Sequence, residues 1–127
     1  MANERRTALI VGGTSGLGLQ LALLLARTHG VVVTGRENPR ELGLSFWYLN
    51  LSSYSSLVSG ISHSLDELVE ELPGVDLFIH AAGFDEHATV GDLNDKGIMD
   101  TLSVGLIAPA MLLQRLLRKQ KSLGGFI

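Results

Sequence analysis

The sequence predicts an α/β fold in which helices cover both faces of a doubly wound parallel sheet, giving three layers. Short apolar runs alternate along the chain with longer segments of helical spacing. The runs are apolar at nearly every position, which is typical of parallel strands buried on both faces. A glycine-rich turn follows the first run and opens the first helix. Together these observations predict a sheet of the Rossmann type, with its ligand at the carboxyl ends of the strands.

The first half of the chain contains three predicted strands and one helix. Residues 8–11 form an apolar run that ends at the glycine turn, and residues 17–27 are helix formers with Gly30 as the expected stop. Residues 31–34 are mostly β-branched and predict the second strand. Residues 46–49 predict the third.

The second half continues the alternation. We expect, in order, a helix over residues 52–72, a strand over 75–81, a loop over 83–95, a helix over 98–120 and the opening of a fifth strand over 124–127. Pro109 lies inside the long helix and predicts a kink. We therefore interpret residues 1–127 as one domain, truncated at the start of its fifth strand.

Composition excludes several classes of function. The 127 residues are 46% hydrophobic and 18% charged, which suits one folded domain with a core. The net charge of −3 argues against nucleic acid as a partner, and the absence of cysteine excludes thiolate chemistry and disulfides. The apolar run 21–26 is far shorter than a membrane span, and residues 1–7 do not resemble a signal peptide. We expect a cytoplasmic protein without a membrane partner.

The glycine turn predicts a phosphate-binding site. Gly12, Gly16 and Gly18 give the spacing Gly-x-x-x-Gly-x-Gly. Free amides and the positive end of the helix dipole favour an anion there, and the hydroxyls of Thr14 and Ser15 can add donors. A Walker loop is excluded because no Lys-Ser or Lys-Thr pair follows the last glycine, and the spacing G-x-G-x-x-G is not present either.

Three segments in register resemble the short-chain dehydrogenase/reductase family. Residues 11–18 match the opening motif Thr-Gly-x-x-x-Gly-x-Gly, with Val11 in place of the threonine. Asn50 and Leu51 stand where the family usually has Asp-Val beside the adenine. Residues 75–83 match the strand that ends in Asn-Asn-Ala-Gly in the family.

The resemblance implies an oxidoreductase that transfers hydride between a nicotinamide cofactor and a small carbonyl or alcohol substrate. It also makes a homo-oligomer plausible, since in this family the long helix often packs in a dimer. The cofactor-binding residues it implies are Gly12, Thr14, Ser15, Gly16, Leu17, Gly18, Arg36, Asn50, Leu51, Ala81, Ala82 and Gly83.

The end of the second strand favours NADP over NAD. Gly35 stands where family members that prefer NAD often carry Asp, and Arg36 follows it. A carboxylate at this position would bind the ribose hydroxyls of NAD, whereas an arginine accommodates the 2′-phosphate of NADP. Glu37 leaves the alternative open, because it could pair with Arg36 or reach the ribose.

The chain carries no complete catalytic set of the family. Its motif Tyr-x-x-x-Lys is absent, because the residues four positions after Tyr48 and Tyr54 are Ser and Val. Gly105 stands at the position of a family Asn on the long helix, and His80 and Ala81 replace the two Asn of the strand motif.

Three alternatives therefore remain beside the enzyme: a non-catalytic NADP(H)-binding or sensor protein, an inactive truncated fragment, and a related sugar-nucleotide-modifying enzyme. A metal site built from His80, His87 and either Asp85 or Glu86 has weak support, because no helical i, i+4 pair and no cysteine accompanies them. We expect no metal, and interpret His80 as a buried or half-buried residue at a strand end, beside the cofactor.

Overall fold

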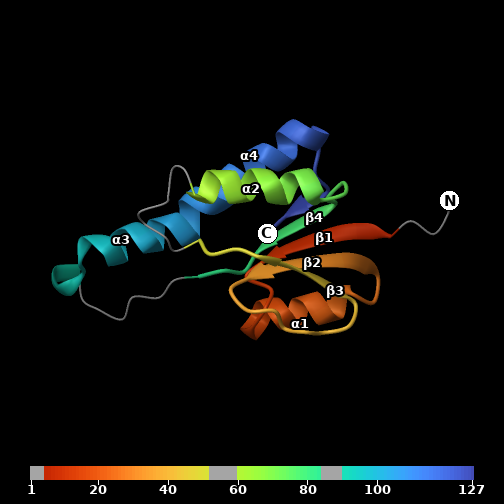
Figure 1. The fold of residues 1–127 in the computed structure, drawn as a ribbon, viewed down its shortest axis with the longest axis horizontal. Coiled ribbons are helices and arrows are strands. Elements are labelled where there is room, and N and C mark those ends of the chain that lie inside the picture. The colour runs from red at the N-terminus through yellow and green to blue at the C-terminus, as the bar shows by residue number, and fades with distance from the viewer. Residues whose placement is uncertain (1–4, 52–59, 84–89) are drawn as a thin grey trace.

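The computed structural model describes residues 5–51, 60–83 and 90–127. Its five parallel strands form one sheet in the order β3-β2-β1-β4-β5. The elements are β1 (Arg6–Val11), α1 (Gly16–Leu25), β2 (His29–Gly35), β3 (Leu44–Tyr48), α2 (Gly60–Glu71), β4 (Leu77–His80), the 3-10 turn η2 (Val90–Asp92), α3 (Asp95–Leu102), the π-helical turn η3 (Ser103–Ile107), α4 (Ala108–Gln120) and β5 (Gly125–Phe126). The predicted doubly wound sheet is confirmed (Figure 1).

The strand register brings three carboxyl ends to one point of the sheet. Val11 at the end of β1 pairs with Thr34 of β2 on one side and with His80 of β4 on the other. The direction in which successive strands are added to the sheet reverses beside β1, because β2 and β3 lie on one side of β1 and β4 and β5 lie on the other. A doubly wound sheet binds its ligands outside such a reversal point.

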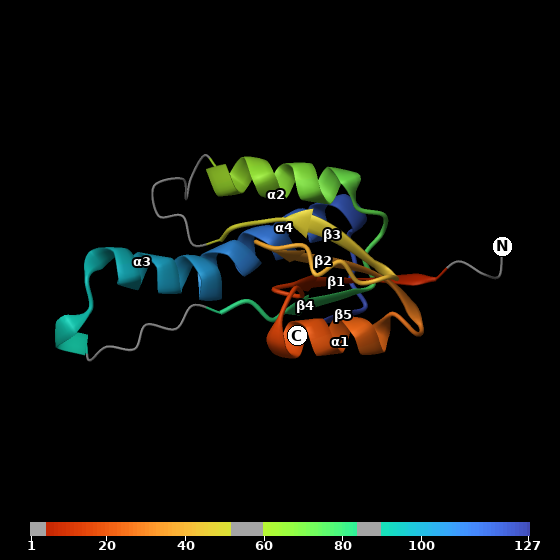
Figure 2. The same ribbon diagram turned by 60° about the horizontal axis from the view of Figure 1, so that its bottom comes forward.

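The core consists of two apolar layers on the two faces of the sheet. Leu9 and Val11 of β1 point into the layer that contains residues of α2 and α4, whereas Ala8 and Ile10 point toward α1. Figure 2 shows α1 on one side of the sheet and α2 with α4 on the other. This burial on both faces explains why the strands are continuously apolar rather than alternating.

Helices α2 and α4 are tied together by side chains of α4. The Arg115 guanidinium donates to Asp66 Oδ1 at 2.6 Å. Lys119 Nζ donates at 2.6 Å to the carbonyl oxygens of both Val69 and Leu72, at the carboxyl end of α2. Because these carbonyls lie in the last turn of the helix, the Lys119 ammonium also complements the helix dipole.

Several predicted boundaries differ from the structure. Gly30 lies inside β2 rather than at a helix end, because the pairing of β2 with β1 begins at His29. The third strand covers residues 44–48 instead of 46–49, and the fourth is shorter than predicted. The helix expected from residue 98 begins at Asp95, since the Asn94 side chain accepts a hydrogen bond from Gly97 N at 2.7 Å. Residues 52–59, with the start of the predicted helix, lie outside the described part of the chain.

The long helix predicted with a kink at Pro109 changes its pitch just before that residue. α3 passes into the π-helical turn η3, in which Ala108 N donates to Ser103 O, and α4 follows. By length and composition alone, the helical stretch Asp95–Gln120 could cross a membrane. Leu112 and Leu116 of this stretch are buried in the core between the sheet and α2, whereas Leu106 is exposed.

Candidate functional site

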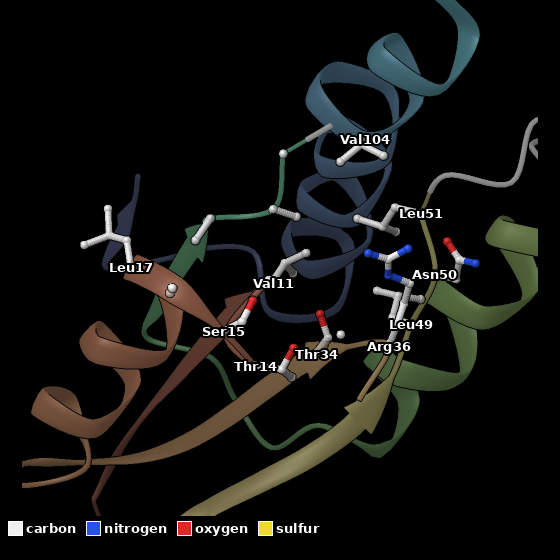
Figure 3. Close-up of a pocket in the computed structure, with 17 residues that line it drawn as sticks. Val11, Thr14, Ser15, Leu17, Thr34, Arg36, Leu49, Asn50, Leu51 and Val104 are labelled. Atoms are coloured by element: carbon white, nitrogen blue, oxygen red, sulfur yellow. The ribbon is translucent and has the colours of Figure 1, made fainter. Parts of the chain in front are cut away.

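A cavity of about 320 Å³ opens at the carboxyl ends of β1, β2 and β4 (Figure 3). It is lined by all twelve residues predicted for the cofactor site: Gly12, Thr14, Ser15, Gly16, Leu17, Gly18, Arg36, Asn50, Leu51, Ala81, Ala82 and Gly83. Five further residues complete the lining, namely Val11, Thr34, Gly35, Leu49 and Val104. Five separate parts of the sequence thus meet around one cavity.

The glycine turn is held tightly between β2 and β4. Gly12 N and Gly13 N donate to the carbonyl oxygen of Thr34 at 3.0 and 3.2 Å. Gly12 has a φ of +81°, and a Cβ there would lie 2.6 Å from Ala82 Cα. A Cβ on Gly18 would collide with the carbonyl oxygen of Gly12. Glycine is therefore required at both positions for the turn to lie this close to the end of β4.

The amino end of α1 opens into the cavity. Gly16, with a φ of +55°, begins the helix, and no described atom lies within 4 Å of where its Cβ would be. Among the described residues, the hydroxyl of the N-cap Ser15 makes no capping bond to the helix, and the first turn has no acidic residue. The first-turn amides lack intrahelical acceptors, so they and the helix dipole present a positive end to this open space.

The β2–β3 side contributes the guanidinium and the side-chain amide of the cavity. Arg36 follows β2 and is exposed, and Figure 3 shows its guanidinium beside Asn50, on the side of the cavity opposite Leu17. A Cβ on Gly35 would lie 2.7 Å from Cγ2 of Thr14. A larger side chain at position 35 therefore requires the Thr14 side chain to move.

The β4 side is formed by small residues, with a helical segment above them. Ala81 N donates to the carbonyl oxygen of Val11 at 2.7 Å, which continues the alignment of β4 with β1 beyond the strand end. Val104 of η3 lines the cavity as well and stands above Val11 in Figure 3. The small side chains leave room for a flat or extended ligand between the strand ends and η3.

His80 is half-buried at the end of β4, as expected, but its ring does not line this cavity. Both ring nitrogens are buried, and within the described chain no hydrogen bond of standard geometry reaches them. Burial lowers the pKa of His80 below its usual value of 6.5, and the backbone of Val104 offsets part of that effect. The imidazole is therefore neutral at pH 7.

The five lining residues outside the predicted cofactor-binding set belong to two kinds. Val11, Thr34, Gly35 and Leu49 lie at or directly after strand ends, so the strand register could have identified them. Val104 adjoins Gly105, which stands at the position of a family Asn, but only the path of the long helix brings Val104 to the site.

Among the residues considered for other chemistry, those that the structure describes do not line this cavity. Tyr48 is 61% exposed on β3, and Gly105 is absent from the lining. Tyr54, Asp85, Glu86 and His87 lie outside the described residues. Within the described ranges, no group of three or more His, Asp or Glu side chains could hold a metal ion.

The parallel sheet with strand order 3-2-1-4-5, and a glycine turn at its reversal point, defines a doubly wound α/β protein of the Rossmann type. Residues 6–127 match the family described as short chain dehydrogenase. The chain belongs to this family, whose members are oxidoreductases.

Solved structures extend the comparison. A short chain dehydrogenase/reductase family protein is 28% identical with a TM-score of 0.75, over 93% of this chain and 51% of that one. A 4-hydroxyisoleucine dehydrogenase complexed with NADH and succinate is 26% identical with a TM-score of 0.68, over 88% and 51%. A gluconate 5-dehydrogenase from Burkholderia cenocepacia J2315, in complex with NADP and tartrate, is 19% identical with a TM-score of 0.71, over 91% and 49%.

The chain therefore spans about half the length of the structures it matches. No curated protein matches it.

Proposed function

We propose that this chain is the NADP(H)-binding half of an oxidoreductase that transfers hydride between the nicotinamide and a small carbonyl or alcohol substrate. The observation that carries the proposal is the cavity at the amino end of α1. There Gly12 and Gly18 pack without room for a side chain, while the space beside Gly16 is open. A pyrophosphate needs such a close approach to the backbone and such free amides.

The residues present fit a dinucleotide along the whole cavity. The first-turn amides of α1 and the hydroxyls of Thr14 and Ser15 would bind the pyrophosphate, and Asn50 and Leu51 would flank the adenine. Ala81, Ala82 and Gly83 would leave room for the nicotinamide half. When bound, the cofactor supplies or accepts the hydride, and these residues bind it and keep it in one orientation.

Two features favour NADP over NAD. Arg36 lies at the end of β2, where its planar guanidinium suits a 2′-phosphate, and it lines the same cavity as the glycine turn. At position 35, where an aspartate would select NAD, a Cβ would contact Thr14. Solved relatives carry either NADP or NADH, so the choice in this chain depends on its own residues.

Titration by isothermal calorimetry tests the cofactor directly. We expect the chain to bind NADPH more tightly than NADH, and Arg36→Ala to weaken NADPH binding about tenfold or more while leaving NADH unchanged. Arg40→Ala is the matched control, since Arg40 lies on the same exposed loop but does not line the cavity. Equal affinities of the unmodified chain for the two cofactors would refute the NADP assignment.

A non-catalytic NADP(H) sensor is the second candidate. It is favoured by Gly105, His80 and Ala81, which occupy positions where the family resemblance implies asparagines. Reduction of a panel of aldehydes and ketones, monitored by NADPH absorbance, distinguishes the enzyme hypothesis from the sensor hypothesis. Turnover supports the enzyme, whereas tight NADPH binding without turnover by a longer chain that carries the family's Tyr-x-x-x-Lys motif supports the sensor.

A further inference from the structure

A buried serine joins the long helix to the segment that follows β3, at the wall of the candidate cofactor cavity. Ser103, the first residue of η3, is fully buried, and its hydroxyl donates to the carbonyl oxygen of Leu51 at 2.7 Å. The two residues are 52 positions apart in the sequence. Leu51 lines the cavity, and so does Val104, which follows Ser103 directly. One hydrogen bond thus connects two separate parts of the cavity wall.

The direction of this hydroxyl is unusual for a helical serine. Serine and threonine inside a helix commonly point to solvent or bond to a carbonyl oxygen of the preceding turn. Thr101 does the latter, because its Oγ1 donates to the carbonyl oxygen of Gly97 at 2.8 Å. Ser103 bonds outside its own helix instead, in surroundings where Leu51 and Val104 both belong to the buried core. A hydroxyl buried there needs a partner, so this bond fixes both groups in place.

The sheet holds the other end of the same segment. Leu49 N donates to the carbonyl oxygen of Gly35 at 2.9 Å, one residue beyond the end of β3. Asn50 lies between this bond and the bond from the helix, and it also lines the cavity. In the view of Figure 3, Leu51 stands between Val104 and Asn50. Residues 49–51 are therefore anchored to the end of β2 on one side and to η3 on the other.

We propose that Ser103 is a positioning residue whose hydroxyl holds Leu51, so that residues 49–51 keep the shape that receives the adenine of the dinucleotide. Ser103 does not itself line the cavity, and therefore acts through Leu51. A segment that is ordered beforehand loses less conformational freedom on binding than one that the ligand must order. The side chain at position 103 thus sets the affinity for the adenine half of the dinucleotide. This inference rests on the proposed function of the cavity.

Two ligands test this assignment on the variant Ser103→Ala. The substitution removes the hydroxyl and introduces the better helix former. It should weaken the binding of NADPH about fivefold. Adenosine 2′,5′-bisphosphate, which has the adenine and the 2′-phosphate but no nicotinamide, should lose affinity by the same factor. If calorimetric titration shows a loss for NADPH alone, or for neither ligand, Ser103 does not act through the adenine side and the inference is wrong.

Thr101→Ala is the matched control. It also removes a bond from a hydroxyl to a carbonyl oxygen, but that bond stays within α3, and neither Thr101 nor Gly97 lines the cavity. This variant should bind both ligands within about twofold of the unmodified chain. An equal loss of affinity in the two variants would indicate general loosening of the helix and would overturn the specific role of Ser103.

Amide exchange without ligand distinguishes this inference from the proposed function. The Leu49 amide is bonded to the Gly35 carbonyl, so its exchange rate reports how firmly residues 49–51 are held. Ser103→Ala should accelerate exchange at Leu49 about fivefold, whereas the amides in the middle of β1 should hardly change. No acceleration at Leu49, or the same acceleration in β1, would contradict the inference. If Leu49 responds as expected but the unmodified chain binds neither ligand, the proposed function is refuted and the anchoring by Ser103 stands.

Discussion

Replacing Gly12 by alanine tests the packing of the glycine turn on which the site depends. Gly12 adopts a φ of +81°, and the added Cβ would lie 2.6 Å from Ala82 Cα and 2.8 Å from the carbonyl carbon of Ala81. These are backbone atoms, so no side-chain rotation can relieve the contact. Gly16 offers a matched comparison, since its φ is +55° but its Cβ would meet no described atom within 4 Å.

The two substitutions should differ clearly in cost. The left-handed conformation costs an L-residue about 1–2 kcal/mol, and overpacking against fixed neighbours adds about 1–3 kcal/mol. In both variants the stiffer unfolded chain offsets about 0.4–1 kcal/mol. We therefore expect Gly12→Ala to lower the free energy of unfolding by about 1–4.6 kcal/mol. For Gly16→Ala no overpacking is added, so the loss should be about 0–1.6 kcal/mol.

Urea unfolding followed by the fluorescence of Trp47, the single tryptophan, measures both variants. Gly12→Ala should unfold at a much lower urea concentration than Gly16→Ala. If the two variants lose the same stability, the close approach of the turn to β4 does not constrain residue 12, and the reasoning fails.

Two further predictions use the same assay. Lys119→Met removes the Nζ donor from the Val69 and Leu72 carbonyls. Because the lysine is solvent-exposed, the free energy of unfolding should fall by only about 1 kcal/mol. Lys121→Met is the control, and equal urea midpoints for the two variants would contradict the capping role of Lys119. Burial lowers the pKa of His80 in the folded chain, so the folded state binds that proton less tightly than the unfolded state. This contribution to stability is complete above about pH 6.5 and is lost as the pH falls below it, so the unmodified chain should lose more stability between pH 7.5 and 5.5 than His80→Leu does. A larger loss in His80→Leu would show the sign to be wrong.

The order of strands and helices could be predicted because each run has one dominant local signal. The β-branched run of β2 and the glycines after β1 act through backbone preferences and burial, which need no knowledge of distant residues. Gly30 misled the prediction for the same reason. Locally it is a helix stop, but its pairing with Thr7 of β1 places it in a strand.

The residues of the candidate site could be predicted where a sequence motif follows the end of a strand. They could not be predicted where the long helix passes over the strand ends. Residues 12–18 and 81–83 both follow strands, so a parallel sheet necessarily brings them together. Val104 reaches the cavity only through the path of α3 and η3. A proline in a sequence indicates a kink, but not that the turn before it will be π-helical.

The most direct test of the central claim is to map NADPH binding on the isotope-labelled chain by amide chemical shifts. The account predicts that the amides of residues 12–18 and 81–83 shift together in one saturable transition. The helix ends remote from the cavity should remain unchanged. Saturable binding whose shifts cluster elsewhere, or no shift at millimolar NADPH, would contradict the assignment of this cavity as the dinucleotide site.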